Sequence, residues 1–175
     1  KRYVSEPSEI RCLGFCVSVK HAEFMASFFN DQGCKALSLS SSSSEEERNS
    51  AKNRIRNGDI NFIFTVDLYN EGVDIPEIDT VMFLRPTESL TVFLQQLGRG
   101  LRTSRNKEFL TVLDYIGQSN KKYSFENKFK ALLNKKNRGL INEIKNGSMS
   151  LPSGCHIEME KEAMEIILDN IKGFH

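Results

Sequence analysis

The sequence predicts an α/β domain in which a parallel sheet is covered by helices on both faces. Short apolar runs of the kind that form buried strands recur along the first two thirds of the chain. Segments with helical spacing separate several of these runs, and strands that alternate with helices form parallel sheets. With 39% hydrophobic and 27% charged residues, the 175-residue chain has the composition of a protein that buries a core.

The first predicted strand is the apolar run at residues 11–17. Ser18 follows it and suits the N-cap of a helix, because a serine hydroxyl accepts a hydrogen bond from a backbone N–H of the first turn. Gly33 is expected to end this helix. Its apolar residues recur at spacings of three and four: Ala22, Met25, Ala26 and Phe29.

A second strand is predicted at residues 35–40, within a segment that continues into a run of serines. Ser44 and Glu47 have the spacing of a capping box, which predicts a helix that ends near Gly58. The serine run also admits another interpretation, a flexible low-complexity loop.

Three further strands are predicted at residues 60–66, 79–85 and 109–115, and residues 89–102 are expected to form a strand-to-helix entry and an amphipathic helix. The carboxyl ends of parallel strands meet at one edge of a sheet. Loops at this edge are where ligands are expected to bind.

The pattern changes after residue 117. Residues 123–145 are expected to be helical with a break near Gly139, and a turn, a short strand and a final helix are expected after residue 150. Residues 118–150 hold eight Lys or Arg and two Asp or Glu, although the whole chain has a net charge of +1. Such a basic stretch favours nucleic-acid binding, with a solvated helix face as the alternative.

The expected organisation therefore has three parts. Residues 1–117 form the α/β domain, residues 118–150 a basic helical segment, and residues 151–175 the start of a truncated C-terminal extension.

The cysteines and the lengths of the apolar runs indicate the cellular compartment of the protein. The four cysteines show no C-x-x-C pair, and those in the apolar run at 11–17 are expected to be buried free thiols. No apolar run approaches the ~20 residues of a membrane span, and no signal peptide is predicted, so we expect a cytoplasmic protein without a membrane partner. The cysteines are Cys12, Cys16, Cys34 and Cys155.

Several catalytic motifs are absent from the sequence. It contains no G-x-x-x-x-G-K-[ST] loop and no strand that ends in a carboxylate pair suited to magnesium. With three histidines, neither a Ser/His/Asp nor a Cys/His constellation can be assembled. No metal site is therefore predicted in this chain.

The segment QQLGRGLR places Arg99 and Arg102 three residues apart, so that both can reach the same spot from one helical turn. Two guanidiniums directed at one place need an anion between them. An always-charged, bidentate group suits a phosphate oxygen that gains charge during phosphoryl transfer. The alternative is a pair of surface arginines that bind Glu88, Glu108 or solvent.

A polar turn lies upstream, between the predicted strands at 60–66 and 79–85. Thr65, at the carboxyl end of the first of these strands, and Gly72 and Asp74, in the loop after it, lie where a site is expected. Taken alone, Asp74 is a turn former before Ile75-Pro76.

Together, these two segments resemble motifs V and VI of the second, C-terminal RecA-like domain of superfamily 2 helicases. Thr65 and Asp67 match the T-x-D part of motif V, and residues 72–74 match its G-[IV]-D part. The Q-x-x-G-R-x-x-R of motif VI is complete, with Gln95, Gly98, Arg99 and Arg102.

The resemblance covers about residues 8–117. Residues 13–26 resemble motif IV, and residues 113–117 resemble the strand that follows motif VI. The amino-acid sequences of these motifs resemble those of the restriction-enzyme-like and repair-like DNA helicase branch more than those of DEAD-box RNA helicases. The segment at 151–155 resembles the start of a C-terminal extension in bacterial members of this branch.

The resemblance implies a RecA-like fold and an ATP site shared with another domain. Arg102 would be the arginine finger on the γ-phosphate, and Arg99 would support the phosphates or couple the motor halves. Gln95 would lie near the γ-phosphate and the attacking water. Asp74 would contact the ribose after a tight turn at Gly72. ATP and Mg²⁺ would be held mainly by an absent N-terminal RecA-like domain of the same protein.

The resemblance also implies a nucleic-acid track. Ser18 and Thr65 would bind its backbone, and the basic segment adds Lys121, Lys122 and Lys128 as expected phosphate contacts. DNA is the expected track, with RNA as a possible one. The aromatics interleaved with these lysines have a spacing that favours a buried helix face over base stacking.

The expected function is the second motor half of an ATP-dependent helicase or translocase, and residues 1–175 alone are expected to be inactive. An alternative is a degenerate motor domain that acts only as a nucleic-acid-binding module. An unrelated flavodoxin-like regulatory domain would leave both the G-V-D turn and the arginine pair unexplained.

Overall fold

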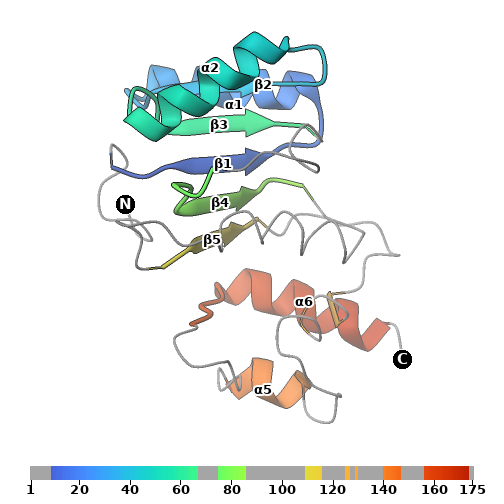
Figure 1. Ribbon diagram of the computed structural model, residues 1–175. Coiled ribbons are helices and arrows are strands. Elements are labelled where there is room, and N and C mark those ends of the chain that lie inside the picture. Colours follow the sequence, from blue (N-terminus) through green and yellow to red (C-terminus); the bar gives the residue numbers. More distant parts are fainter. Residues whose placement is uncertain are drawn as a thin grey trace. The chain divides into compact units, whose positions relative to one another are not determined.

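The computed structural model describes residues 9–66, 75–85, 109–115, 125–126, 129, 140–146 and 156–173 (Figure 1). The chain divides into two compact units. The first comprises Lys1–Thr87 and Thr91–Tyr115, and the second Glu88–Leu90 and Ile116–His175.

The first unit contains a five-stranded parallel sheet in the order β2-β3-β1-β4-β5. The sequence prediction of a parallel α/β fold is confirmed. Each strand is shorter than the apolar run that predicted it, because the runs continue past the hydrogen-bonded ladder into the loops. The strands are β1 Cys12–Phe15, β2 Ala36–Leu39, β3 Phe62–Thr65, β4 Thr80–Phe83 and β5 Thr111–Asp114.

Two helices, α1 (Val19–Asp31) and α2 (Glu45–Asn57), connect the first three strands. The chain moves outward from β1 to β2 and returns from β2 to β3. Because such connections are right-handed, helices on crossovers of opposite direction cover opposite faces. Figure 1 shows α2 in front of the sheet and α1 behind it.

Both helices begin as the sequence predicted. Ser18 is the N-cap of α1, where its Oγ accepts a hydrogen bond from His21 N at 3.2 Å. At α2, Ser44 Oγ accepts from Glu47 N while Glu47 Oε2 accepts from Ser44 N at 2.7 Å, which completes the capping box. Gly58 caps the other end with a φ of 81°, a left-handed conformation that glycine adopts without strain.

The core on the α1 face is built on phenylalanines. The ring of Phe29 packs against Phe62 and Phe64, with centroid distances of 4.6 and 5.0 Å. Gly14 on β1 pairs with Phe64 on the neighbouring strand. A Cβ atom at Gly14 would lie 2.5 Å from Phe64 Cδ1, so this glycine provides the space that the ring occupies.

Asn30, near the end of α1, joins this helix to β2. Its Nδ2 donates to Ala36 O at 2.9 Å and to Ala26 O at 2.8 Å, and its Oδ1 accepts from Ala36 N at 3.0 Å. One side chain thus satisfies both backbone groups of Ala36 and fixes the spacing between helix and strand.

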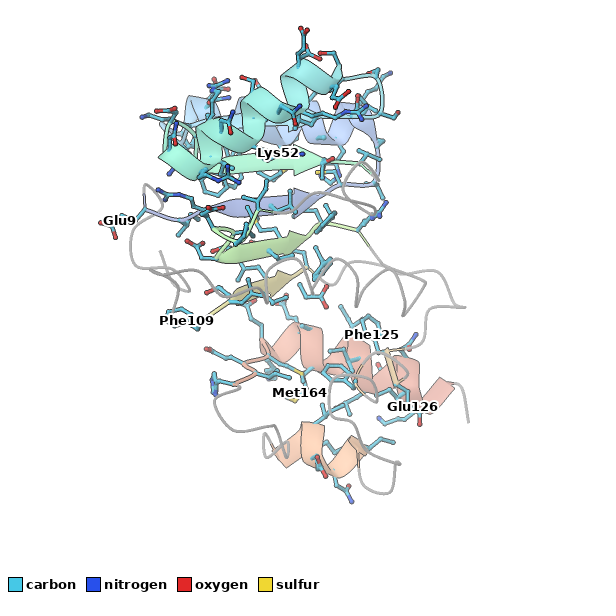
Figure 2. All side chains as sticks on the ribbon, viewed as in Figure 1. Glu9, Lys52, Phe109, Phe125, Glu126 and Met164 are labelled. Carbon is cyan, nitrogen blue, oxygen red and sulfur yellow. The ribbon has the colours of Figure 1, made fainter. Side chains whose placement is uncertain are left out.

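The second unit has a core of its own, formed with helices α5 (Leu140–Asn146) and α6 (Lys161–Gly173). Figure 2 shows Phe125 and Met164 among its side chains. Its buried members are Phe125, Phe129, Ile144, Ile167, Leu168 and Ile171. The expectation that the aromatics of the basic segment form a buried face is confirmed for Phe125 and Phe129.

This core draws on residues from both sides of position 150, and the boundary predicted there stays a prediction. The predicted final helix is confirmed as α6. The short strand expected before it is wrong over residues 156–160, which form neither helix nor strand. Glutamates alternate with apolar residues in this stretch, and the alternation resembles a strand without forming a ladder. Over the described parts of the chain, no helix is long and apolar enough to cross a membrane.

Candidate nucleic-acid interface

The carboxyl edge of the sheet carries both described site residues. Ser18 follows β1, and Thr65 ends β3, which pairs with β1 through Phe15 and Thr65. Ser18 is exposed at the N-terminus of α1, whose first turn contains no acidic residue. Orphan N–H groups and a positive dipole end make such a helix start compatible with a phosphate.

Thr65 has a different environment from Ser18. It is fully buried, and its Oγ1 makes no hydrogen bond within the described part of the chain. In register, it lies between Leu39 on β2 and Phe15 on β1, both apolar and buried. A buried hydroxyl without a partner costs about 1–3 kcal/mol, a cost that is tolerated where the group serves a ligand or a nearby loop. The predicted contact of Thr65 with nucleic acid stays a prediction.

Thr65→Val is expected to raise the free energy of unfolding by about 1 kcal/mol, because valine keeps the shape and removes an unpaired polar group. Thr80→Val is the matched control. Thr80 is also a buried strand residue, 2% exposed, but its Oγ1 donates to Asp79 Oδ1 at 2.8 Å. The control should therefore lower stability by about 1 kcal/mol in the same denaturant titration. A destabilised Thr65→Val protein would contradict this account and show that the hydroxyl is satisfied.

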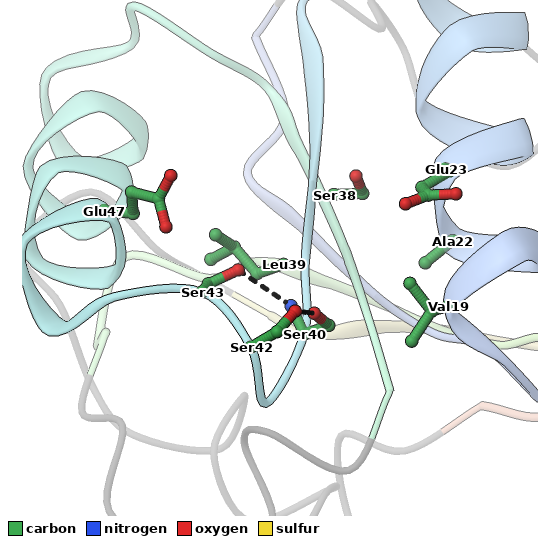
Figure 3. A pocket seen from close by; sticks show the side chains of 9 residues that line it. All are labelled: Val19, Ala22, Glu23, Ser38, Leu39, Ser40, Ser42, Ser43 and Glu47. Carbon is green, nitrogen blue, oxygen red and sulfur yellow. Dashed lines mark hydrogen bonds between the residues drawn. The ribbon is translucent and has the colours of Figure 1, made fainter.

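A polar pocket of about 270 Å³ lies beside the first turn of α1 (Figure 3). The start of α1, the end of β2 and the start of α2 form its walls. Ser40 N donates to Ser43 Oγ at 3.1 Å, and Ser43 N donates to Ser40 O at 3.0 Å, so the serine run forms a hydrogen-bonded turn. The lining residues are Val19, Ala22, Glu23, Ser38, Leu39, Ser40, Ser42, Ser43 and Glu47.

The pocket offers hydroxyl groups together with carboxylates. Ser40 Oγ and Ser42 Oγ lie 2.7 Å apart and share one hydrogen bond. Glu47 is engaged in the capping box, and Glu23 is exposed. Carboxylates oppose a lone anion, whereas serine hydroxyls can bind sugar and phosphate groups of a passing strand without reading its sequence. The arrangement therefore suits the side of a track rather than an isolated phosphate site.

The buried thiols are not nucleophiles. Burial raises the pKa of Cys16 to about 11, against a smaller opposing effect of the Arg85 charge. Burial also raises the pKa of Cys12, and the negative charge of Asp79 adds to the effect. Both groups are therefore protonated at neutral pH, and only thiolates attack. The expectation of buried free thiols is confirmed for these two residues.

All of the predicted ATP and lysine contacts lie outside the described residues: Gly72, Asp74, Gln95, Arg99, Arg102, Lys121, Lys122 and Lys128. Within the described ranges, no group of three His, Cys, Asp or Glu side chains could hold a metal ion. This part of the chain thus offers no set of ligands for Mg²⁺.

Sequence reasoning did not identify an ion pair between the end of α2 and the residues that precede β4. Arg56 Nε donates to Glu77 Oε1 at 3.1 Å, which joins the last turn of α2 to the described residues 75–79. The partners are 21 residues apart and share no periodic pattern, so the sequence alone carried no signal for the pair.

Comparison with known proteins shows which family the chain resembles. Residues 2–104 match the family model described as "Helicase conserved C-terminal domain". The chain is 30% identical over 105 residues to yeast IRC3 (Saccharomyces cerevisiae), whose name describes an ATP-dependent helicase; the match covers 60% of this chain and 15% of that protein. It is also 30% identical over 102 residues to the "ATP-dependent RNA helicase drs1" of Botryotinia fuckeliana, covering 58% of this chain and 13% of the relative.

Among solved structures, the E. coli DEAD-box protein SrmB, crystallised with the regulator RraA, has a similar fold. The TM-score is 0.54 at 22% sequence identity, covering 63% of this chain and 65% of the SrmB chain. This likeness supports the RecA-like fold that the motifs implied. The chain spans about a seventh of the length of the two curated relatives.

Proposed function

Because the chain belongs to the helicase conserved C-terminal domain family, we propose that it is the second motor half of an ATP-dependent helicase or translocase. One observation of the structure carries the nucleic-acid part of the proposal. The carboxyl edge of the sheet presents the exposed N-terminus of α1, with Ser18 at its cap, beside a hydroxyl-lined pocket. Exposed N–H and hydroxyl groups at one edge suit contacts to a sugar-phosphate backbone.

The ATP part of the proposal rests on the motifs and on the names of the relatives, which describe ATP-dependent enzymes. Arg102 acts as the finger on the γ-phosphate, with Arg99 and Gln95 beside it. Asp74 contacts the ribose, and Gly72 permits the turn before it. As the resemblance of the motifs implies, ATP and Mg²⁺ are held mainly by an N-terminal RecA-like domain. That domain is the proposed partner within the same protein.

We further propose that the track is DNA, because the sequences of motifs V and VI resemble those of the DNA helicase branch. The relatives include an RNA helicase, so the test compares DNA and RNA directly. Binding of single-stranded DNA, duplex DNA and single-stranded RNA of one sequence should rank the DNA forms first. Equal or stronger binding of RNA would contradict the choice of DNA and leave the motor proposal in place.

Changing Lys121, Lys122 and Lys128 to Gln is expected to weaken binding to every sequence alike. Each lost phosphate contact should also flatten the dependence of log K on log salt concentration by about one unit, because fewer counterions are released. Titrations of wild type and variant at several salt concentrations measure both effects.

A second triple variant controls for net charge. Lys52, on α2, and Lys161 and Lys172, on α6, lie outside the basic segment, and changing them to Gln removes the same charge (Figure 2 labels Lys52). It should leave the salt dependence close to that of wild type. Equal slopes for wild type and the Lys121/Lys122/Lys128 variant would mean that these lysines form only a solvated face.

The alternative, a module that binds nucleic acid without hydrolysis, differs in one measurable respect. The intact protein should hydrolyse ATP faster when nucleic acid is added. Binding without any hydrolysis would instead support the module. A G-x-x-x-x-G-K-[ST] loop encoded upstream of Lys1 is the matching expectation at the level of sequence.

A further inference from the structure

Helix α1 presents two phenylalanines on the side that faces away from the sheet. Phe24 and Phe28 are 62% and 49% exposed. The helix packs onto the sheet through Ala22 and Ala26, which are 1% and 6% exposed. At about 100° per residue, both phenylalanines lie about 140–180° around the helix from the middle of this buried side. Packing within the unit therefore gives no reason for aromatic side chains at these two positions.

The two exposed rings are held in place by other aromatic rings. The rings of Phe24 and Phe28 stack with a centroid distance of 6.2 Å and an interplanar angle of 21°. Phe28 also meets the partly buried Phe29 edge-on, with a centroid distance of 6.1 Å. Because the rings are ordered before any partner binds, they lose little conformational entropy on binding. Rigid aromatic side chains of this kind are typical anchors of protein–protein interfaces.

Two charged residues flank the aromatic pair, and both are placed against the helix dipole. Lys20 lies in the first turn of α1 and Asp31 is its last residue, and both are exposed. A helix N-terminus favours negative charge and a C-terminus favours positive charge, so neither residue stabilises its own helix. The two residues are about 16 Å apart along the axis and cannot pair with each other. At about 100° per residue, four side chains fall within an arc of about 80°, which we call the outward stripe: Lys20, Phe24, Phe28 and Asp31.

The outward stripe is complementary to a second copy of itself. Two α1 helices that pack antiparallel across a two-fold axis can place Lys20 of each copy opposite Asp31 of the other. In this register, Phe24 of one copy lies over Ser27 of the other, a small exposed side chain that leaves room for the ring. Each charge then meets an opposite charge and lies near the end of the other helix whose dipole favours it. A second copy thus accounts both for the exposed rings and for the reversed charges.

We propose that this protein forms a reversible homodimer through the outward stripe. The stripe matches itself end to end, which favours a second copy over an unrelated protein as the occupant. One helix face is a small contact compared with the ~1,200–2,000 Å² of stable interfaces, so we expect a dissociation constant on the order of 10–100 µM. The inference uses no ATP or nucleic-acid contact and stands independently of the proposed motor function.

The test measures the sedimentation velocity of the intact protein from about 1 to about 300 µM, a range that spans the expected dissociation constant. Wild type should change from monomer to dimer across this range. Lys20→Glu and Asp31→Lys, each alone, should weaken dimerisation at least about tenfold, because each places like charges together at both ends of the contact. An equimolar mixture of the two variants should recover dimerisation, because each variant then supplies the charge that the other needs.

The aromatic pair is tested by combining Phe24→Gln with Phe28→Gln. This variant should stay monomeric over the same range, and its Tm at low protein concentration should match that of wild type, because both rings are exposed. Two variants of α6 are the matched controls. Lys161→Glu makes the same charge change in the first turn of a helix, and Ile166→Gln replaces an apolar side chain that is 40% exposed. Both should dimerise like wild type.

A wild-type protein that stays monomeric throughout would overturn the proposal, and so would dimers that persist without the two phenylalanines. A mixture that stays as dissociated as its two components would exclude the contact between Lys20 and Asp31. A monomeric wild type whose Tm falls when the phenylalanines are replaced would show that another domain of the protein covers the stripe. If Lys20→Glu weakens DNA binding and leaves dimerisation unchanged, the lysine contacts the track and the proposal is wrong.

Discussion

Arg102→Ala is expected to lower kcat for ATP hydrolysis by the intact protein about 10³-fold and to change KM little. A finger binds charge that develops on the phosphoryl oxygens as the reaction proceeds. Its loss therefore raises the free energy of the transition state and leaves the binding of ATP in the ground state unchanged. Steady-state kinetics at saturating nucleic acid measure the two parameters separately. Arg102→Lys should remain strongly impaired, because an ammonium keeps the charge and loses the planar, bidentate fork.

Arg105→Ala is the control for this prediction. It removes a neighbouring cation that lies beyond the Q-x-x-G-R-x-x-R motif, which ends at Arg102, and it should retain most of the wild-type kcat. A variant of Arg102 with an increased KM and an unchanged kcat would show that the residue only helps to hold ATP.

Gly14→Ala is expected to lower the free energy of unfolding by about 1–3 kcal/mol, a large effect for one added methyl group. The new Cβ would lie 2.5 Å from Phe64 Cδ1 and 2.8 Å from Phe64 Cε1. The ring cannot move freely, because it is fully buried and packs against Phe29. Urea denaturation of wild type and variant gives the difference.

Two further variants test the cause of this instability. Phe64→Leu makes room at the contact, so Gly14→Ala should cost less in that background than in wild type, and the double-mutant cycle should show this coupling. Gly33→Asn adds a side chain where nothing lies within 4 Å of the new Cβ, at a φ of 81° that asparagine tolerates. It should cost clearly less than Gly14→Ala. Additive effects of the changes at 14 and 64 would contradict a steric origin.

Local signals predicted the elements well. The capping serines and the glycine at position 58 act through atoms within a few residues, so the sequence contains the whole interaction. The helix starts at Ser18 and Ser44 are confirmed for that reason. The alternation of polar and apolar residues at 156–160 led to a wrong prediction of a strand. A strand also needs a neighbouring strand to pair with, and a local pattern carries no information about that neighbour.

The order of the strands in the sheet, and the contacts that depend on this order, could not be predicted from local sequence patterns. A sequence of alternating strands and helices specifies a parallel sheet but not that β1 lies between β3 and β4. The contact between Gly14 and Phe64 follows only once that register is known. The one available sign of this contact was that Gly14 lies inside an apolar run. Glycine in a strand often marks a place where another group approaches the backbone closely. The buried state of Thr65 likewise depends on its neighbours across the sheet, Leu39 and Phe15.

The bridge made by Asn30 has a consequence for solubility. β2 is an edge strand, and Lys35 O, one residue before it, accepts bonds from Asn61 N and Phe62 N, so the backbone groups of Ala36 face away from β3. Asn30 occupies both of these groups, much as a residue of a neighbouring strand would. Beyond the other end of β2, Ser43 Oγ accepts from Ser40 N in the same way. An exposed edge invites another chain to add a strand and aggregate. Two side chains thus leave only a short stretch of this edge open to intermolecular pairing.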